Sequence, residues 1–180
     1  MILWLKKGGI IKLTEQQKFD VVERIKKFEI RHYHPCVLAE VLVQGQLDSA
    51  ASLGFRPLVT YISQNGISMT APVLQEKVSD QSWLVSFVMP ANAKLEDLPL
   101  PQNTQVTLKK VPAHYAVALI FSGGMSKEKI LEKESQLREF INENKFQTVG
   151  TLKIARYDPP WKPGFLRQNE VIFEVEMLNL

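Results

Sequence analysis

The same order of strands and helix occurs twice along this chain of 180 residues. In each copy a strand pattern is interrupted by a proline: Pro35 divides residues 28–43, and Pro112 divides residues 106–121. One helical pattern and two further strands follow in both copies. Two copies of so long a unit exclude a solenoid. We therefore predict two strand-strand-helix-strand-strand repeats, at residues 28–90 and 105–176.

The first predicted helix covers Ala50–Ile62, with Asp48 or Ser49 as its N-cap. Gly54 and Pro57 both lie inside this segment. A proline in a helix interior removes one backbone hydrogen bond, so we expect a kink or a bulge there.

The second predicted helix begins after an N-cap at Ser126 and runs to Asn144. Its inward stripe consists of Ile130, Leu137, Phe140 and Ile141. β-Branched and aromatic runs predict further strands at Phe19–Ile25, Ile67–Val73, Trp83–Met89, Thr148–Tyr157 and Glu170–Val175. Because the helices separate groups of adjacent strands, the pattern predicts an α+β fold with a largely antiparallel sheet.

Composition excludes several classes of protein. The net charge is +3, and the 22 basic residues alternate with 19 acidic ones, so nothing favours a nucleic-acid partner. The single cysteine, Cys36, cannot form an internal disulfide, which fits a reducing compartment. No apolar run is long enough to span a membrane, and the N-terminal one is too short for a signal peptide. We expect a cytoplasmic protein with a loosely attached arm at residues 1–17 and one domain at residues 18–180.

The proline-rich segment Tyr157–Val175 is the strongest candidate for a functional loop. It is either an ordered connection that covers a sheet edge or the wall of a ligand pocket. His32 and His34 have the spacing to share one metal, but no third ligand lies at a diagnostic distance. No nucleophile has a recognisable base and orienting acid, so we predict a protein that is not an enzyme.

Four motifs resemble the SOUL haem-binding protein family, in that family's order. They are FEIRHYHPCVLAEV, ISMTAPV, LVSFVMP and the final YDPP with WKP and RQNEV, and together they span Phe19 to Val175. The resemblance implies a distorted antiparallel β-barrel with two long helices packed outside. It also implies non-enzymatic binding, buffering or transport of haem or a related tetrapyrrole. The pocket would lie between the first helix and the proline-rich loop.

The resemblance further implies a set of site residues. His32 falls where some members have an iron ligand, although others bind tetrapyrrole through apolar contacts alone. A histidine bonded within the sheet is the alternative. The expected walls are Leu53, Phe55, Val59, Met69, Trp161 and Phe165, and the expected propionate partners are Arg56, Lys162 and Arg167. Ser52 and Thr60 are neutral where haem-carrying members are basic. Two other functions stay open: binding of another apolar small molecule, and contact with an unknown protein partner.

Overall fold

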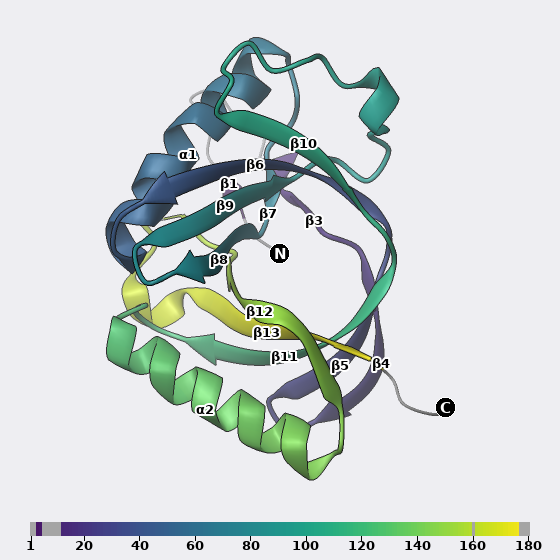
Figure 1. The fold of residues 1–180 in the computed structure, drawn as a ribbon, viewed down its shortest axis with the longest axis vertical. Coiled ribbons are helices and arrows are strands. Elements are labelled where there is room, and N and C mark those ends of the chain that lie inside the picture. Colours follow the sequence, from purple (N-terminus) through teal and green to yellow (C-terminus); the bar gives the residue numbers. More distant parts are fainter. Residues whose placement is uncertain (1–2, 5–11, 160, 177–180) are drawn as a thin grey trace.

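A nine-stranded sheet dominates the computed structural model, which describes residues 3–4, 12–159 and 161–176 (Figure 1). Its strands lie in the order β10-β6-β9-β8-β12-β13-β11-β5-β4, and every neighbouring pair is antiparallel. The bounds of these strands are β4 Phe19–Ile25, β5 Phe28–Tyr33, β6 Cys36–Gln44, β8 Val73–Ser79, β9 Ser82–Val88, β10 Val106–Val111, β11 His114–Ser122, β12 Gln147–Arg156 and β13 Gln168–Glu176.

The strand order is symmetric about the middle of the sheet. From the middle outwards, β8, β9, β6 and β10 correspond to β12, β13, β11 and β5. The first strand of each sequence repeat therefore pairs with the second strand of the other repeat: β5 pairs with β11, and β10 pairs with β6. Among the described residues, the end strands β10 and β4 are not paired with each other, so the sheet is not closed. The predicted α+β fold with a large antiparallel sheet and two helices is confirmed, but the barrel is not.

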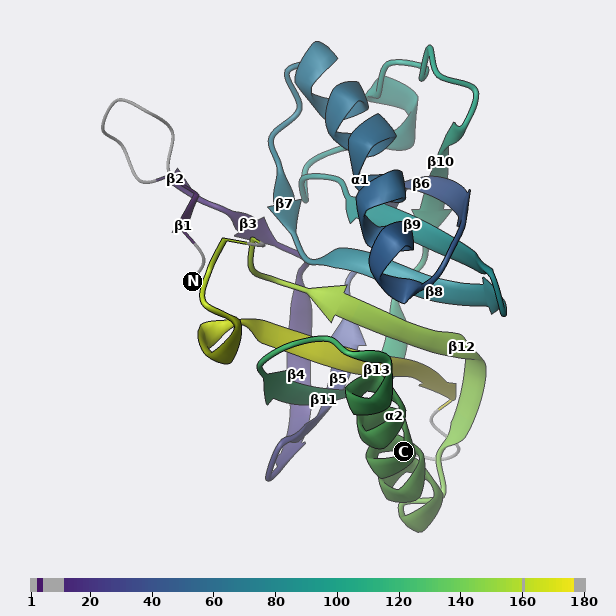
Figure 2. The ribbon, with the colours of Figure 1, turned by 90° about the vertical axis from the view of Figure 1, so that its left-hand side faces the viewer.

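The two helices, α1 Leu47–Gln64 and α2 Lys127–Glu143, lie on the outer side of the curved sheet. Strands β8 and β12 run between them (Figure 2). Helix α2 matches its prediction: the Ser126 side chain accepts a hydrogen bond from the backbone N–H of Lys129. Its predicted inward residues Ile130, Leu137, Phe140 and Ile141 are all buried.

Helix α1 departs from its prediction at the N-terminus. It begins at Leu47, and its N-cap residue Gln46 makes no side-chain capping bond. The Ser49 hydroxyl donates instead to the Gln46 carbonyl, at 3.0 Å, so neither predicted cap acts as one. The helix continues without interruption through Pro57. Gly54 has a packing role, because a Cβ at this position would lie 2.4 Å from Val85 Cβ on β9.

The strand predicted at Ile67–Val73 is wrong in its bounds. Pro72 has no N–H for a ladder bond, and the chain changes sheets at this residue. Before it, β7 (Thr70–Ala71) pairs in parallel with β3 (Glu15–Gln16); after it, β8 joins the main sheet.

The predicted N-terminal arm is only partly covered by the described residues. Residues 1–2 and 5–11 lie outside them. Two short strands, β1 (Leu3–Trp4) and β2 (Lys12–Leu13), pair with each other. The backbone N–H of Gln17 donates to the Ala71 carbonyl, at 2.8 Å, so the end of the arm is hydrogen-bonded to the domain.

Buried residues cover both faces of the sheet. Along β6, Val37, Ala39 and Val41 pack in the cluster under α1, whereas Leu38 points to the opposite, inner face. A further cluster packs under α2. The inner face therefore forms a separate interior, around which the strands curve (Figure 1).

Candidate functional site

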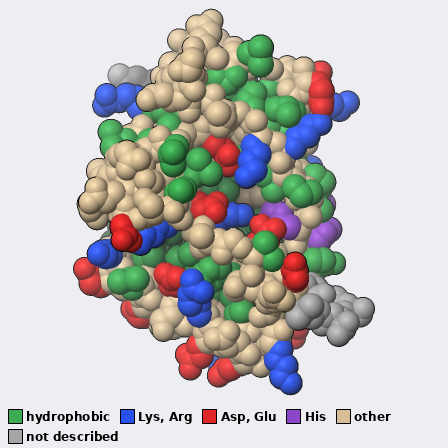
Figure 3. All heavy atoms as spheres, viewed as in Figure 1, with side chains coloured by type: hydrophobic (Ala, Val, Ile, Leu, Met, Phe, Trp, Pro, Cys, Tyr) green, Lys and Arg blue, Asp and Glu red, His purple; other side chains and the backbone are tan. Residues whose placement is uncertain are grey.

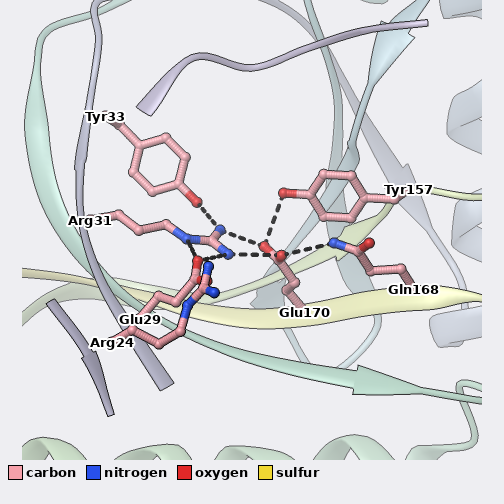
Figure 4. Close-up of polar contacts among 7 residues, drawn as sticks. All are labelled: Arg24, Glu29, Arg31, Tyr33, Tyr157, Gln168 and Glu170. Atoms are coloured by element: carbon pink, nitrogen blue, oxygen red, sulfur yellow. Dashed lines mark hydrogen bonds and ion pairs between the residues drawn. The ribbon is translucent and has the colours of Figure 1, made fainter. Parts of the chain in front are cut away.

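A buried ionic network lies on the inner face of the sheet (Figure 4). The Arg31 guanidinium on β5 binds the Glu170 carboxylate on β13 through two hydrogen bonds, of 2.6 and 2.9 Å. Its Nε atom donates to Glu29 Oε2 at 2.7 Å. The side chains of Arg31 and Glu170 are each 1% exposed, so both charges are removed from water together.

Two tyrosines complete this network. Arg31 Nη1 donates to the hydroxyl of Tyr33 at 2.8 Å, and the Tyr157 hydroxyl donates to Glu170 Oε2 at 2.9 Å. Burial raises the pKa of both tyrosines, and for Tyr157 the nearby charge of Glu170 raises it further. Burial opposes the charge of Arg31, but its hydrogen bond to Glu170 raises the Arg31 pKa above the usual value. The network therefore contains tyrosines held neutral and an arginine held charged.

A cavity of about 440 Å³ lies on the outer side of the sheet, between α1 and the segment that follows β12. Five of the predicted site residues line it: Phe55, Arg56, Val59, Met69 and Arg167. The remaining lining residues are Ala51, Ser52, Thr70, Ala71, Val73, Met125, Arg156, Tyr157, Asp158, Pro159 and Asn169.

A sequence profile described as SOUL heme-binding protein matches residues 14–174, which is nearly the whole chain. This chain belongs to the SOUL heme-binding protein family. No curated protein sequence matches it.

Solved structures that resemble this SOUL chain share its fold at low sequence identity. The C-terminal domain of EcmrR superimposes with a TM-score of 0.68 at 14% identity, covering 84% of this chain and 98% of that domain. A hydrolase from Listeria innocua superimposes with a TM-score of 0.59 at 13% identity, covering 86% and 94%. At these identities the likeness concerns the fold alone.

The first and last SOUL motifs meet in the ionic network. Glu29, Arg31 and Tyr33 come from FEIRHYH, whereas Tyr157 belongs to YDPP and Glu170 to RQNEV. Arg31 and Glu170 are 139 positions apart in the sequence. These motif residues bind one another, so their first role is to join the two ends of the SOUL domain.

The proline-rich loop is held by Asp158, whose side chain is 1% exposed. Asp158 Oδ1 accepts from Lys162 Nζ at 2.8 Å, and Asp158 Oδ2 accepts from the backbone N–H of Gln168 at 2.7 Å. Arg167 Nε donates to the Lys162 carbonyl, also at 2.7 Å. The loop thus presents a fixed wall to the cavity and includes a 3₁₀ turn at Gly164–Leu166.

The other predicted site residues do not line this cavity. Leu53 on α1 is 53% exposed, and Trp161 and Phe165 on the loop are 65% and 76% exposed. Lys162 is paired with Asp158 within the loop itself.

His32 lies on β5, away from this cavity. Its ring centroid is 4.8 Å from that of Tyr115 and 6.2 Å from that of His34. The histidines visible in Figure 3 lie on its right-hand side, whereas α1 lies at the upper left in the same view. His32 is not among the residues that line the cavity, which include Phe55, Val59 and Met69.

Arg156 is the cavity residue that sequence reasoning missed. It is the last residue of β12, and its Nε and Nη2 atoms are buried without a hydrogen-bond partner. Burial lowers the Arg156 pKa and Arg167 lowers it further, while the charge of Asp48 raises it. The only signal in the sequence was its place directly before YDPP.

A second and larger cavity, of about 600 Å³, lies between α2 and the β8–β9 hairpin. Several charged side chains of this cavity already form ion pairs with one another: Lys77 with Asp80 at 2.8 Å, and Arg138 with Glu134 at 2.7 Å. The smaller cavity is the stronger candidate site, because the half-buried Arg156 has two shielded hydrogen-bonding atoms without partners.

No three His, Cys, Asp or Glu side chains within residues 3–4, 12–159 and 161–176 gather into a group that could hold a metal ion. None of the helices in that part of the chain has the length and apolar character needed to cross a membrane.

Proposed function

We propose that this SOUL protein binds haem or a related tetrapyrrole, without chemical change, in the cavity between α1 and the proline-rich loop. Membership of a family described as heme-binding supports the ligand class. The cavity, at about 440 Å³, lies within the range of small-molecule sites, roughly 300–1,000 Å³. In this proposal the protein is a carrier or buffer that holds the ligand and catalyses no reaction on it.

The chemistry of the cavity carries the proposal. Phe55, Val59 and Met69 are half-buried and present apolar surface to it. Arg56 and Arg167 supply positive charge at the same cavity. A flat apolar ring with carboxylate substituents matches this combination of apolar walls and guanidinium groups.

The proposal assigns no iron-ligand role to His32. Because His32 does not line the cavity, binding there depends on apolar contacts and on the carboxylates of the ligand. An iron-free porphyrin should therefore bind about as well as haemin.

Titration with haemin and with protoporphyrin IX, followed by the Soret band and by quenching of tryptophan fluorescence, tests this function. We expect saturable binding of both ligands at micromolar concentrations. Phe55→Ala should weaken both, whereas Leu53→Ala, on the exposed side of the same helix, should not. His32→Ala should leave both titrations unchanged. The absence of saturable binding would remove the proposal, and loss of haemin binding in His32→Ala alone would move the site to β5.

A second candidate function is contact with another copy of the same chain. Trp161, Phe165 and Leu166 are 65%, 76% and 55% exposed on one loop, and exposed apolar groups of this kind can mark an interface. Sedimentation at several concentrations tests this alternative. A dimer that is lost in Phe165→Ser would support it, and a monomer at every concentration would exclude it.

A further inference from the structure

Arg156 is half-buried, and two of its three guanidinium nitrogens have an unusual environment. Its Nε and Nη2 atoms are shielded from solvent and form no hydrogen bond. Buried polar groups are almost always hydrogen-bonded, and buried charges are almost always paired. An exception at the wall of a cavity calls for a partner from outside the chain.

The carboxylates near Arg156 are engaged or too distant. Asp158 lines the same cavity, but both of its oxygens accept hydrogen bonds from the proline-rich loop. Asp48 raises the Arg156 pKa through its charge, yet it forms no ion pair with Arg156 and does not line the cavity. No carboxylate of the described residues therefore forms an ion pair with Arg156.

The other cations of the cavity add to this positive charge. Arg167 lines it and lowers the pKa of Arg156, as expected for a like charge nearby. Arg56 also lines it, from an exposed position on α1. Three guanidinium groups thus face one cavity whose other wall is apolar, which favours a ligand that is both apolar and anionic.

We propose that Arg156 is the receptor for a carboxylate of the bound ligand, so that the site selects tetrapyrroles with free acid side chains over their esters. This inference rests on the proposed function and assigns its charge selectivity to one residue. No hydrogen bond holds the Nε–Nη2 edge of Arg156, so none has to break for this edge to receive a carboxylate. This edge can bind both oxygens of a carboxylate at once, which a lysine ammonium cannot reproduce. Arg56 and Arg167 are placed to receive a second carboxylate.

The test compares protoporphyrin IX with its dimethyl ester, in one buffer that contains a fixed low concentration of mild detergent. Wild type should bind the diacid at least about tenfold more tightly than the ester, as expected for a charge-assisted bidentate contact. Arg156→Met should remove most of this preference by weakening the diacid only. Arg156→Lys should restore part of it. Arg138→Met, on α2 and outside this cavity, should keep the full preference.

The outcomes separate this inference from the function on which it rests. If wild type binds neither porphyrin, the proposed function fails and the inference fails with it. If wild type binds both, but Arg156→Met keeps the preference or weakens diacid and ester equally, only the role of Arg156 is overturned. Circular dichroism and the Tm of each variant show whether it is folded, and Arg156→Lys retains the charge if Arg156→Met does not fold.

Discussion

Two arginines in this molecule have opposite surroundings: Arg31 is fully buried, whereas Arg156 is half-buried. Arg31 lies on the inner face of the sheet and binds Glu29, Glu170 and Tyr33. Arg156 lies at a cavity on the outer side, and its Nε and Nη2 atoms have no partner. The residue type is the same, so the surroundings decide the role: Arg31 holds the fold together, and Arg156 is available to a ligand.

Alternation along the strands explains why the two arginines face different sides. On β12, Ala155 belongs to the inner cluster, whereas Ile154 packs in the outer cluster under α2. Arg156 follows Ile154 by two positions and so points to the same outer side. We therefore expect that a substitution of Arg31 or Glu170 lowers the stability of the fold, whereas a substitution of Arg156 lowers the affinity for porphyrin.

The largest effect is expected from breaking the inner ion pair. Glu170→Gln removes the two-bond ion pair of buried Arg31 and leaves only its contact with Glu29, which should lower the free energy of unfolding by about 3–5 kcal/mol. Urea unfolding measures this loss as a lower midpoint. Glu176→Gln, at the exposed end of the same strand, should change the free energy of unfolding by less than about 0.5 kcal/mol. A loss under about 1 kcal/mol for Glu170→Gln would show that the pair is not a structural one.

A substitution at the α1–β9 contact should affect stability and binding together. The Cβ introduced by Gly54→Ala would lie 2.4 Å from Val85 Cβ, so α1 must shift outward. We expect a loss of about 1–3 kcal/mol in the free energy of unfolding. Porphyrin affinity should also fall, because α1 carries Phe55 and Val59 of the cavity wall.

Urea unfolding and the porphyrin titration test both effects in the same variant. Ser63→Ala, at an exposed position of the same helix, is the control and should change neither property. Unchanged stability in Gly54→Ala would contradict the close approach of helix and strand.

Sequence patterns predicted the parts of the fold that depend on residues close to one another in the sequence. Helix α2 carries its own cap and a regular apolar stripe, and both were identified correctly. Helix α1 has no side-chain cap, so its start could not be identified from Asp48 or Ser49. Pro72 divides the predicted strand Ile67–Val73 between two sheets, and a propensity pattern does not contain that information.

The site was less accessible from the sequence because it depends on contacts between distant segments. The pairing of Arg31 with Glu170 joins residues 139 positions apart. The resemblance to the SOUL family implied that Trp161 and Phe165 face the pocket, but both side chains are exposed at the surface. Arg156 could be assigned to a strand, but its lack of a partner follows only from the packing around it.

Removal of the unpaired arginine should not weaken the fold. Arg156→Met keeps most of the side-chain volume and removes a desolvated charge, so the free energy of unfolding should stay the same or rise by about 1 kcal/mol. The matched comparison is Arg31→Met, which should lose about 3–5 kcal/mol because it leaves the buried Glu170 carboxylate without its cation. Urea unfolding of both variants measures the contrast. Equal losses in the two would mean that Arg156 also has a structural partner.

The smallest predicted effect concerns Glu40, a buried carboxyl on the inner face. Its carboxylate accepts a hydrogen bond from the Ser86 hydroxyl, at 3.4 Å, and burial raises the Glu40 pKa above the usual value. The folded state therefore favours the protonated form. Protonated Glu40 thus stabilises the folded state. This contribution is complete below the unfolded-state pKa of about 4.3 and is lost as the pH rises through the higher folded-state pKa. At pH 7, Glu40→Gln should therefore be more stable than wild type. Unfolding free energies measured between pH 4 and pH 7 should show this advantage shrinking toward acid. An advantage that grows toward acid would mean that the carboxylate is well paired, as Glu170 is.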